Sequence, residues 1–232
     1  MGETVKISVT DGHQYDAYVA QPEGMPKAAL VVLQEIFGVS RHIRRMTDSF
    51  AAQGYYAVAP ALFDRYERGV DLGSSPADWE KALSFVRQIN MSWAQADVEA
   101  AVNYARDEYK TEVGVVGFCL GGSLAWLAAA HLPIGAAVGY YGGYIARFLD
   151  QRPQVPILLH FGNKDEHIPP EDVAAIEAAY PEVPVYLYDA GHAFDRQGGP
   201  TYDAAASALA LDRTLAFLAQ HLTMDSKQPL QD

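Results

Sequence analysis

The only cysteine of the chain, Cys119, lies in the segment Gly-Phe-Cys-Leu-Gly-Gly at residues 117–122. An apolar run at residues 113–116 precedes this segment, and a helix-like stretch at residues 123–131 follows it. A strand, a tight turn between glycines and a helix together form a nucleophile elbow, which presents its central side chain at the start of the helix. A thiolate is a nucleophile. We therefore predict that Cys119 attacks an electrophilic carbon.

Two further side chains complete a constellation that could activate this thiol. Asp165 follows an apolar run at residues 157–161, and His192 follows another at residues 185–188. A histidine can take the thiol proton and later protonate a leaving group, and an aspartate on the other ring nitrogen orients it. The chain order of nucleophile, acid and histidine is that of the α/β-hydrolase triad. We predict that Cys119, Asp165 and His192 are catalytic.

Backbone N–H groups near Cys119 are expected to form an oxyanion hole. The N–H of Leu120 lies at the start of the helix that follows the elbow, where the helix dipole favours negative charge. The second donor is expected in the loop after the apolar run at residues 28–33, and we assign it to the N–H of Ile36. One such donor stabilises a developing oxyanion by roughly 3 kcal/mol.

Apolar runs alternate with helical patterns along most of the chain. This alternation predicts an α/β-hydrolase fold, with a mostly parallel sheet, helices on both faces and an antiparallel N-terminal edge made by a hairpin. We expect a single domain over residues 1–222 and a frayed polar tail over residues 223–232. The expected strands span residues 5–9, 15–20, 28–33, 55–60, 113–116, 134–141, 157–161 and 185–188. The expected helices span residues 40–53, 76–89, 93–109, 123–131, 170–180 and 202–222, the first with Ser40 as its cap.

Composition excludes several classes of partner. Lys and Arg number 17 against 29 Asp and Glu, a formal charge of −12, which disfavours binding to nucleic acid or to anionic membranes. The chain has no apolar run of the roughly 18 residues that span a bilayer and no visible signal peptide. With one cysteine, no internal disulfide can form. We expect a cytoplasmic protein, without a metal because the histidines lack metal-ligand spacing.

Four segments together resemble the dienelactone hydrolase family, also called carboxymethylenebutenolidases. They are Gln-Glu-Ile-Phe-Gly at residues 34–38, the elbow at residues 117–122, Gly-Tyr-Tyr-Gly at residues 139–142 and Ala-Gly-His-Ala-Phe at residues 190–194. The resemblance extends over about residues 5–222. It implies an enzyme that opens a lactone or ester through a thioester on the cysteine, without a cofactor and on a small-molecule substrate that can carry a carboxylate.

The resemblance also implies roles for side chains around the triad. Glu35 matches a family glutamate that holds the resting thiol and moves aside when substrate arrives. Arg196 matches an arginine that binds the substrate carboxylate, for which a guanidinium is suited. Phe37 and Tyr141 are placed in the wall of the substrate pocket. The family has a second arginine where this chain has Lys81, so Lys81, or Arg65 or Arg68 nearby, is a candidate replacement.

Other interpretations of these residues stay open at the level of sequence. Cys119 could be a small buried hydrophobe, Asp165 a turn former and Glu35 a solvated loop carboxylate. Arg196 could be the surface partner of Asp195 or Asp203. Two alternative functions follow, namely a general carboxylesterase for small substrates and a hydrolase-fold thiol sensor without turnover.

Overall fold

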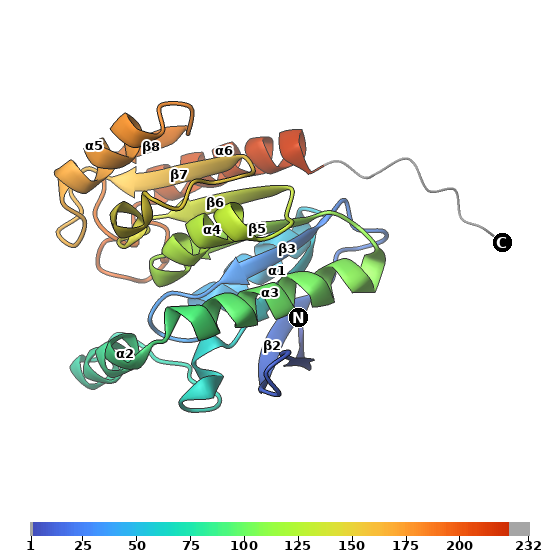
Figure 1. The fold of residues 1–232 in the computed structure, drawn as a ribbon. Coiled ribbons are helices and arrows are strands. Elements are labelled where there is room, and N and C mark those ends of the chain that lie inside the picture. The colour runs from blue at the N-terminus through green and yellow to red at the C-terminus, as the bar shows by residue number, and fades with distance from the viewer. Residues whose placement is uncertain (1, 223–232) are drawn as a thin grey trace.

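The computed structural model describes residues 2–222, which form an eight-stranded sheet between helices (Figure 1). The tail expected at residues 223–232 lies outside the described residues. The strand order is β1-β2-β4-β3-β5-β6-β7-β8. The strands are β1 (Glu3–Ser8), β2 (Gln14–Ala20), β3 (Ala29–Leu33), β4 (Tyr56–Pro60), β5 (Val113–Phe118), β6 (Ala136–Tyr140), β7 (Ile157–Gly162) and β8 (Val185–Tyr188).

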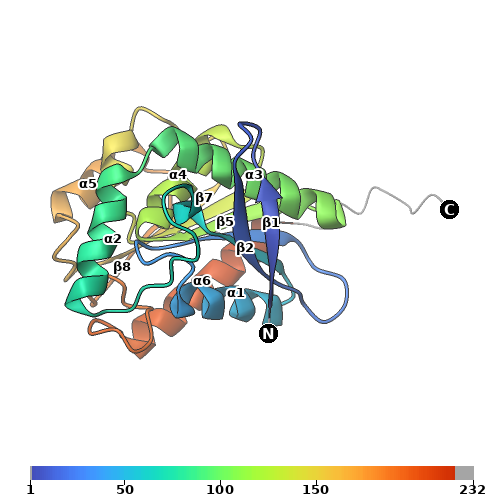
Figure 2. The ribbon, with the colours of Figure 1, turned by 90° about the horizontal axis from the view of Figure 1, so that it is seen from below.

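Helices connect the strands and cover both faces of the sheet. The helices are α1 (Arg41–Ala52), α2 (Pro76–Gln88), α3 (Met91–Tyr109), α4 (Leu120–His131), α5 (Pro170–Ala179) and α6 (Ala204–His221), with short 3₁₀ helices η1 (Leu62–Arg65) and η2 (Ile145–Phe148). Figure 2 shows α3 and α4 on one face of the sheet and α1 and α6 on the other.

The predicted fold class is confirmed. The six strands β4, β3, β5, β6, β7 and β8 run parallel to one another, whereas β2 is antiparallel to both β1 and β4. Every residue of β3, β4, β5, β6 and β7 is buried. This is the burial expected of parallel strands covered on both faces, and it explains why these segments are continuous apolar runs.

The register of the central strands places two loops side by side. Leu33 at the end of β3 pairs with Gly117 near the end of β5. The loop that carries Ile36 therefore begins next to the turn that carries Cys119. Both loops leave the carboxyl edge of the sheet, where α/β proteins bind their ligands.

The structure departs from the expected elements in local details. Ser40 occupies the N-cap position of α1, but its side chain makes no capping hydrogen bond, so the predicted cap is wrong. The sequence predicted neither η1 nor η2. Single turns of this kind lack the periodicity that marks longer helices. Among residues 2–222, no helix has the length and apolarity required to cross a membrane.

Candidate active site

Cys119 lies on a strained turn between β5 and α4. Its backbone has φ 55° and ψ −113°, a conformation that non-glycine residues rarely adopt and that persists only where the surroundings enforce it. The Cys119 N–H donates to the Tyr140 carbonyl at 2.9 Å, and the Gly121 N–H donates to the Gln34 carbonyl at 3.0 Å. These bonds hold the turn between β6 and the loop after β3. The side chain is partly exposed.

Asp165 and His192 form a hydrogen-bonded pair at the ends of β7 and β8. The Nδ1 of His192 lies 2.7 Å from the Oδ2 of Asp165. The other carboxylate oxygen, Oδ1, accepts the N–H groups of His167 at 2.8 Å and Ile168 at 3.1 Å. Asp165 is therefore both the turn former and the partner of the histidine, because its two oxygens serve different bonds. The Asp165 side chain is only 1% exposed.

The pKa of His192 shows how closely it is coupled to the neighbouring residues. Burial favours the neutral imidazole, but the electrostatic influence of Cys119 and the hydrogen bond to Asp165 outweigh it and raise the pKa of His192 to about 10. An imidazolium that is stabilised by a neighbouring thiolate is the charge state of an activated cysteine–histidine pair. The structure thus brings together the three residues that the sequence singled out.

The two predicted oxyanion donors are available. Within residues 2–222, neither the Ile36 N–H nor the Leu120 N–H donates to a backbone carbonyl outside the regular elements. Leu120 is the first residue of α4, and the first N–H groups of a helix have no partner inside it. The Gly121–Gln34 hydrogen bond fixes the two donor segments against each other.

Glu35, Arg196 and Phe37 form a second group close to the elbow. The Glu35 side chain is 2% exposed, and its Oε2 lies 3.7 Å from Nη1 of Arg196 without a hydrogen-bond partner among the described residues. The guanidinium carbon of Arg196 lies 4.7 Å from the centre of the Phe37 ring. Glu35 is therefore buried rather than solvated. The guanidinium of Arg196 lies next to Glu35 and does not pair with Asp195 or Asp203.

Tyr141 connects the triad to buried polar residues that sequence reasoning missed. Its ring centre lies 4.9 Å from that of His192, and its hydroxyl donates to Oδ1 of Asp195. Burial, together with the charges of Asp195 and Glu35, holds the pKa of Tyr141 well above its usual range, so the hydroxyl stays a donor. Oδ2 of Asp195 lies 3.5 Å from Nε2 of His42 in α1. Because Asp195 and His42 are 153 positions apart in the sequence, no local pattern could have paired them.

The candidates for a second carboxylate-binding cation are engaged elsewhere. Lys81 pairs with Glu67 at 2.6 Å in an exposed position. Arg65 makes a bidentate bond to Asp97, at 2.8 and 2.6 Å, and Arg68 donates to the carbonyl of Gln14 at 2.6 Å. The role of Lys81 in substrate binding stays a prediction that these contacts do not favour.

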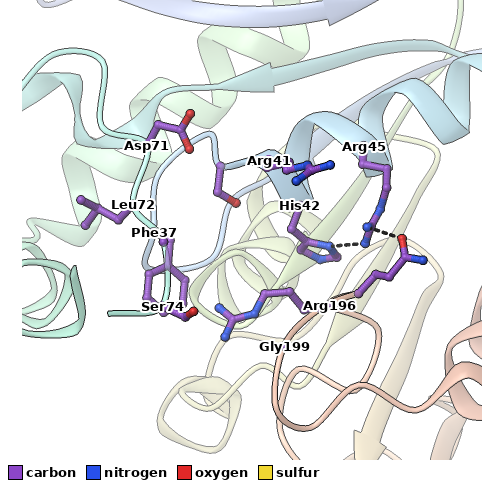
Figure 3. A pocket seen from close by; sticks show the side chains of 13 residues that line it. Phe37, Arg41, His42, Arg45, Asp71, Leu72, Ser74, Arg196 and Gly199 are labelled. Atoms are coloured by element: carbon purple, nitrogen blue, oxygen red, sulfur yellow. Dashed lines mark hydrogen bonds between the residues drawn. The ribbon is translucent and has the colours of Figure 1, made fainter. Parts of the chain in front are cut away.

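A pocket of about 640 Å³ adjoins this group (Figure 3). Figure 3 shows Arg41, His42 and Arg45 of α1 on one side of the pocket and Phe37 and Ser74 on the other, with the Arg196 guanidinium toward Phe37. The complete lining consists of Phe37, Ser40, Arg41, His42, Arg45, Asp71, Leu72, Gly73, Ser74, Arg196, Gln197, Gly198 and Gly199. Phe37 and Arg196 belong both to the pocket and to the surroundings of Glu35, so the pocket opens beside the elbow.

Comparison with known proteins identifies the family of this site. The sequence model of the dienelactone hydrolase family matches residues 15–222. The chain belongs to the dienelactone hydrolase family. It is 38% identical to the carboxymethylenebutenolidase of Pseudomonas putida over 98% of this chain and 99% of that protein. It is 31% identical to carboxymethylenebutenolidase 1 of Cupriavidus pinatubonensis over 94% of this chain and 97% of that protein.

Solved structures agree with this membership. A dienelactone hydrolase candidate from Klebsiella pneumoniae has a TM-score of 0.82 and 27% identity, and the match covers 95% of this chain and 99% of the other. A dienelactone hydrolase from Anabaena variabilis, at 17% identity and a TM-score of 0.72, shares the fold over 96% of this chain and 98% of its own. This member of the dienelactone hydrolase family is therefore an enzyme that hydrolyses ester or lactone bonds of small molecules.

Proposed function

We propose that this enzyme opens a lactone or ester by covalent catalysis with Cys119 as the nucleophile. The observation that carries the proposal is the Asp165–His192 pair, joined at 2.7 Å, together with the strained turn that presents Cys119. These residues follow β7, β8 and β5, at one edge of the sheet. A cysteine that served only as a small hydrophobe would need neither the strained backbone nor the charged partner.

The reaction takes place in two stages. The Cys119 thiolate attacks the carbonyl carbon, and the N–H groups of Ile36 and Leu120 stabilise the oxyanion. The bond to the leaving oxygen breaks, His192 gives that oxygen its proton, and a thioester remains. His192 then removes a proton from water, which attacks the thioester and releases the acid and the Cys119 thiolate. Asp165 keeps the histidine oriented throughout.

Arg196 and Glu35 suggest how a carboxylate on the substrate would activate the enzyme. Glu35 is buried beside Arg196 at 3.7 Å, a contact too long for a hydrogen bond. A substrate carboxylate can bind the guanidinium bidentately and so take Arg196 from Glu35. We propose that Glu35 restrains the resting thiol and is released in this exchange, while Phe37 and Tyr141 form apolar walls of the site.

The deciding experiment replaces the nucleophile. We expect Cys119→Ala to abolish hydrolysis of an activated aryl ester, because no other side chain can form the covalent intermediate, while circular dichroism shows an intact fold. Mass spectrometry of the native enzyme during turnover should detect an acyl group on Cys119. Retained turnover in Cys119→Ala, or acylation at another residue, would refute the proposal.

The rate at which iodoacetamide alkylates Cys119 tests the proposed role of Glu35. In the native enzyme we expect a substrate analogue that carries a carboxylate to change the alkylation rate of Cys119. In Glu35→Gln, the rate should no longer respond to the analogue, because the restraint is already absent. An identical response in both proteins would show that Glu35 does not control the thiol.

A further inference from the structure

The side chain of Gln34 is fully buried between the end of β3 and the start of η1, and no step of the proposed reaction involves it. Its Oε1 accepts the N–H of Leu62 in η1 at 3.0 Å, and its Nε2 donates to the carbonyl of Glu35 at 3.2 Å. A side-chain amide has one end that accepts and one that donates, so only this orientation satisfies both partners. Gln34 is therefore fixed in position and in direction.

The carbonyl that Gln34 holds belongs to the same peptide group as the N–H of Ile36. The peptide bonds of the described residues are trans. In a trans peptide group the atoms lie in one plane, and the C=O and N–H bonds point in opposite directions. The group that binds the Glu35 carbonyl therefore also sets the direction of the Ile36 N–H.

The order of the strands indicates which way this N–H points. β3 lies between β4 and β5 in the sheet. Because η1 follows β4, the Gln34 amide and the Glu35 carbonyl that it binds lie on the β4 side of β3. The Ile36 N–H on the opposite side of the peptide group therefore points toward β5, and Cys119 directly follows that strand.

The main chain of Gln34 also binds the elbow. Its C=O accepts the N–H of Gly121 at 3.0 Å, and Gly121 directly follows Leu120 at the start of α4. The backbone of Gln34 thus contacts the helix that carries one expected oxyanion donor. Its side chain contacts the peptide group that carries the other.

We propose that Gln34 is a positioning residue for the oxyanion hole, whose side-chain amide holds the Glu35 carbonyl and so directs the Ile36 N–H at the oxygen of the reacting carbonyl. The bond acts in two ways. It fixes the peptide plane before the substrate arrives, and it polarises the peptide group, which strengthens the hydrogen bond that the N–H donates. The inference rests on the proposed function, because it assigns a further residue to the same tetrahedral intermediate.

Steady-state hydrolysis of an activated aryl ester by Gln34→Met tests this role. Methionine keeps the length of the side chain but has no N–H to donate. We expect kcat and kcat/KM to fall together by about tenfold to a hundredfold at unchanged KM, because the misdirected donor matters only in the transition state.

Thr47→Val is the matched control. Thr47 is also fully buried, and its hydroxyl donates to the Ile43 carbonyl at 2.7 Å within α1. The substitution therefore removes a buried hydrogen bond to a carbonyl without touching the loop after β3, and kcat should stay at the native value. An equal fall of kcat in Thr47→Val and Gln34→Met would overturn the proposal.

Alkylation of Cys119 by iodoacetamide separates a positioning role from a merely structural one. The thiolate displaces iodide from a saturated carbon, so this reaction forms no oxyanion and needs no oxyanion donor. We expect Gln34→Met to be alkylated at the native rate although its ester hydrolysis falls. Equal losses in alkylation and hydrolysis, or unchanged hydrolysis, would overturn the proposal.

A trifluoromethyl ketone provides the complementary probe. The Cys119 sulfur bonds to the ketone carbon, and the electron pair of the C=O bond moves to the oxygen, which becomes an oxyanion. Its affinity for Gln34→Met should fall by the same factor as kcat/KM, as expected of an analogue of the transition state. Undiminished affinity would overturn the proposal.

The native enzyme gives a test that does not depend on the folding of a variant. NMR spectra compare the Ile36 backbone amide and the Gln34 side-chain amide before and after the trifluoromethyl ketone adds to Cys119. We expect both protons to move downfield, because the charged oxygen strengthens the connected hydrogen bonds. A Gln34 amide that does not respond while Ile36 does would overturn the proposal. Failure of the Cys119 mechanism would appear instead as turnover in Cys119→Ala, a result independent of whether Gln34→Met lowers kcat.

Discussion

His192 takes its charge state from its neighbours more than from its burial. The imidazole is mostly buried, which disfavours a charge, yet Cys119 and Asp165 raise its pKa to about 10. Because the pKa in the folded enzyme lies above the ordinary value of 6.5, folding binds the proton more tightly. The stability contributed by this histidine is complete below pH 6.5 and is lost as the pH rises through about 10.

Removal of the Cys119 sulfur should therefore lower the pKa of His192. We expect the pKa of His192 to fall from about 10 toward its ordinary range in Cys119→Ala, because the largest favourable influence on the imidazolium is removed. NMR titration of the imidazole carbon-bound protons measures this change. The native enzyme should lose activity as the pH rises through about 10, since His192 can then no longer protonate the leaving oxygen. A pKa that stays near 10 in Cys119→Ala would show that Asp165 alone sets it.

The elbow depends on close contacts between whole elements, and glycine makes them possible. A Cβ atom on Gly121 would lie 2.4 Å from the Leu33 carbonyl oxygen and 2.7 Å from that of Gln34. Both are backbone atoms and cannot rotate away. α4 can therefore start against the end of β3 only with glycine at this position, and the same approach holds the two oxyanion donors together.

Gly121→Ala should separate these elements. We expect a decrease of about 2–3 kcal/mol in the free energy of unfolding, as is typical of overpacking in a well-packed interior, and a loss of activity beyond what the stability change explains. Urea unfolding and ester hydrolysis measure the two effects. Gly143→Ala is the control, because its Cβ would meet nothing closer than 3.6 Å, and it should change stability by less than about 0.5 kcal/mol. Equal effects of the two substitutions would contradict the close-contact argument.

At the scale of the whole molecule, a buried ion pair connects the antiparallel edge to the rest of the fold. Arg65 in η1 makes a bidentate bond to Asp97 of α3, and the same guanidinium lies 2.8 Å from Asp11 in the hairpin turn. The Tyr15 hydroxyl of β2 donates to the Asp97 carbonyl at 2.6 Å. The Asp97 side chain is 1% exposed. Arg65 thus connects three segments that are distant in the sequence, namely η1, α3 and the turn of the N-terminal hairpin.

Loss of both partners should be less harmful than the sum of the two single losses. We expect Asp97→Ala to lower the free energy of unfolding by about 3–5 kcal/mol, because it leaves the Arg65 charge buried and poorly paired. The double variant with Arg65→Ala should lose less than the sum of the two single losses, a coupling that urea unfolding of all three proteins would measure. Strict additivity would show that the pair does not couple these segments.

The sequence alone predicted the order of elements and the candidates for the reactive residues. Buried parallel strands are continuous apolar runs, so β3, β4, β5, β6 and β7 could be recognised locally. Parallel strands end at the same edge of a sheet. For that reason, Cys119, Asp165 and His192 could be expected to meet although they are far apart in the chain. The resemblance of four short segments pointed to the family that the comparisons then showed.

Only the tertiary structure decided what surrounds those residues. The contact of His42 with Asp195 and that of Arg45 with Gln197 depend on how α1 packs against a loop some 150 positions later. Lys81 likewise has Glu67 as its partner because of where α2 lies. Hydrophobic patterning specifies which face of an element is buried, but it carries no information on which polar side chains of distant loops come within hydrogen-bond distance.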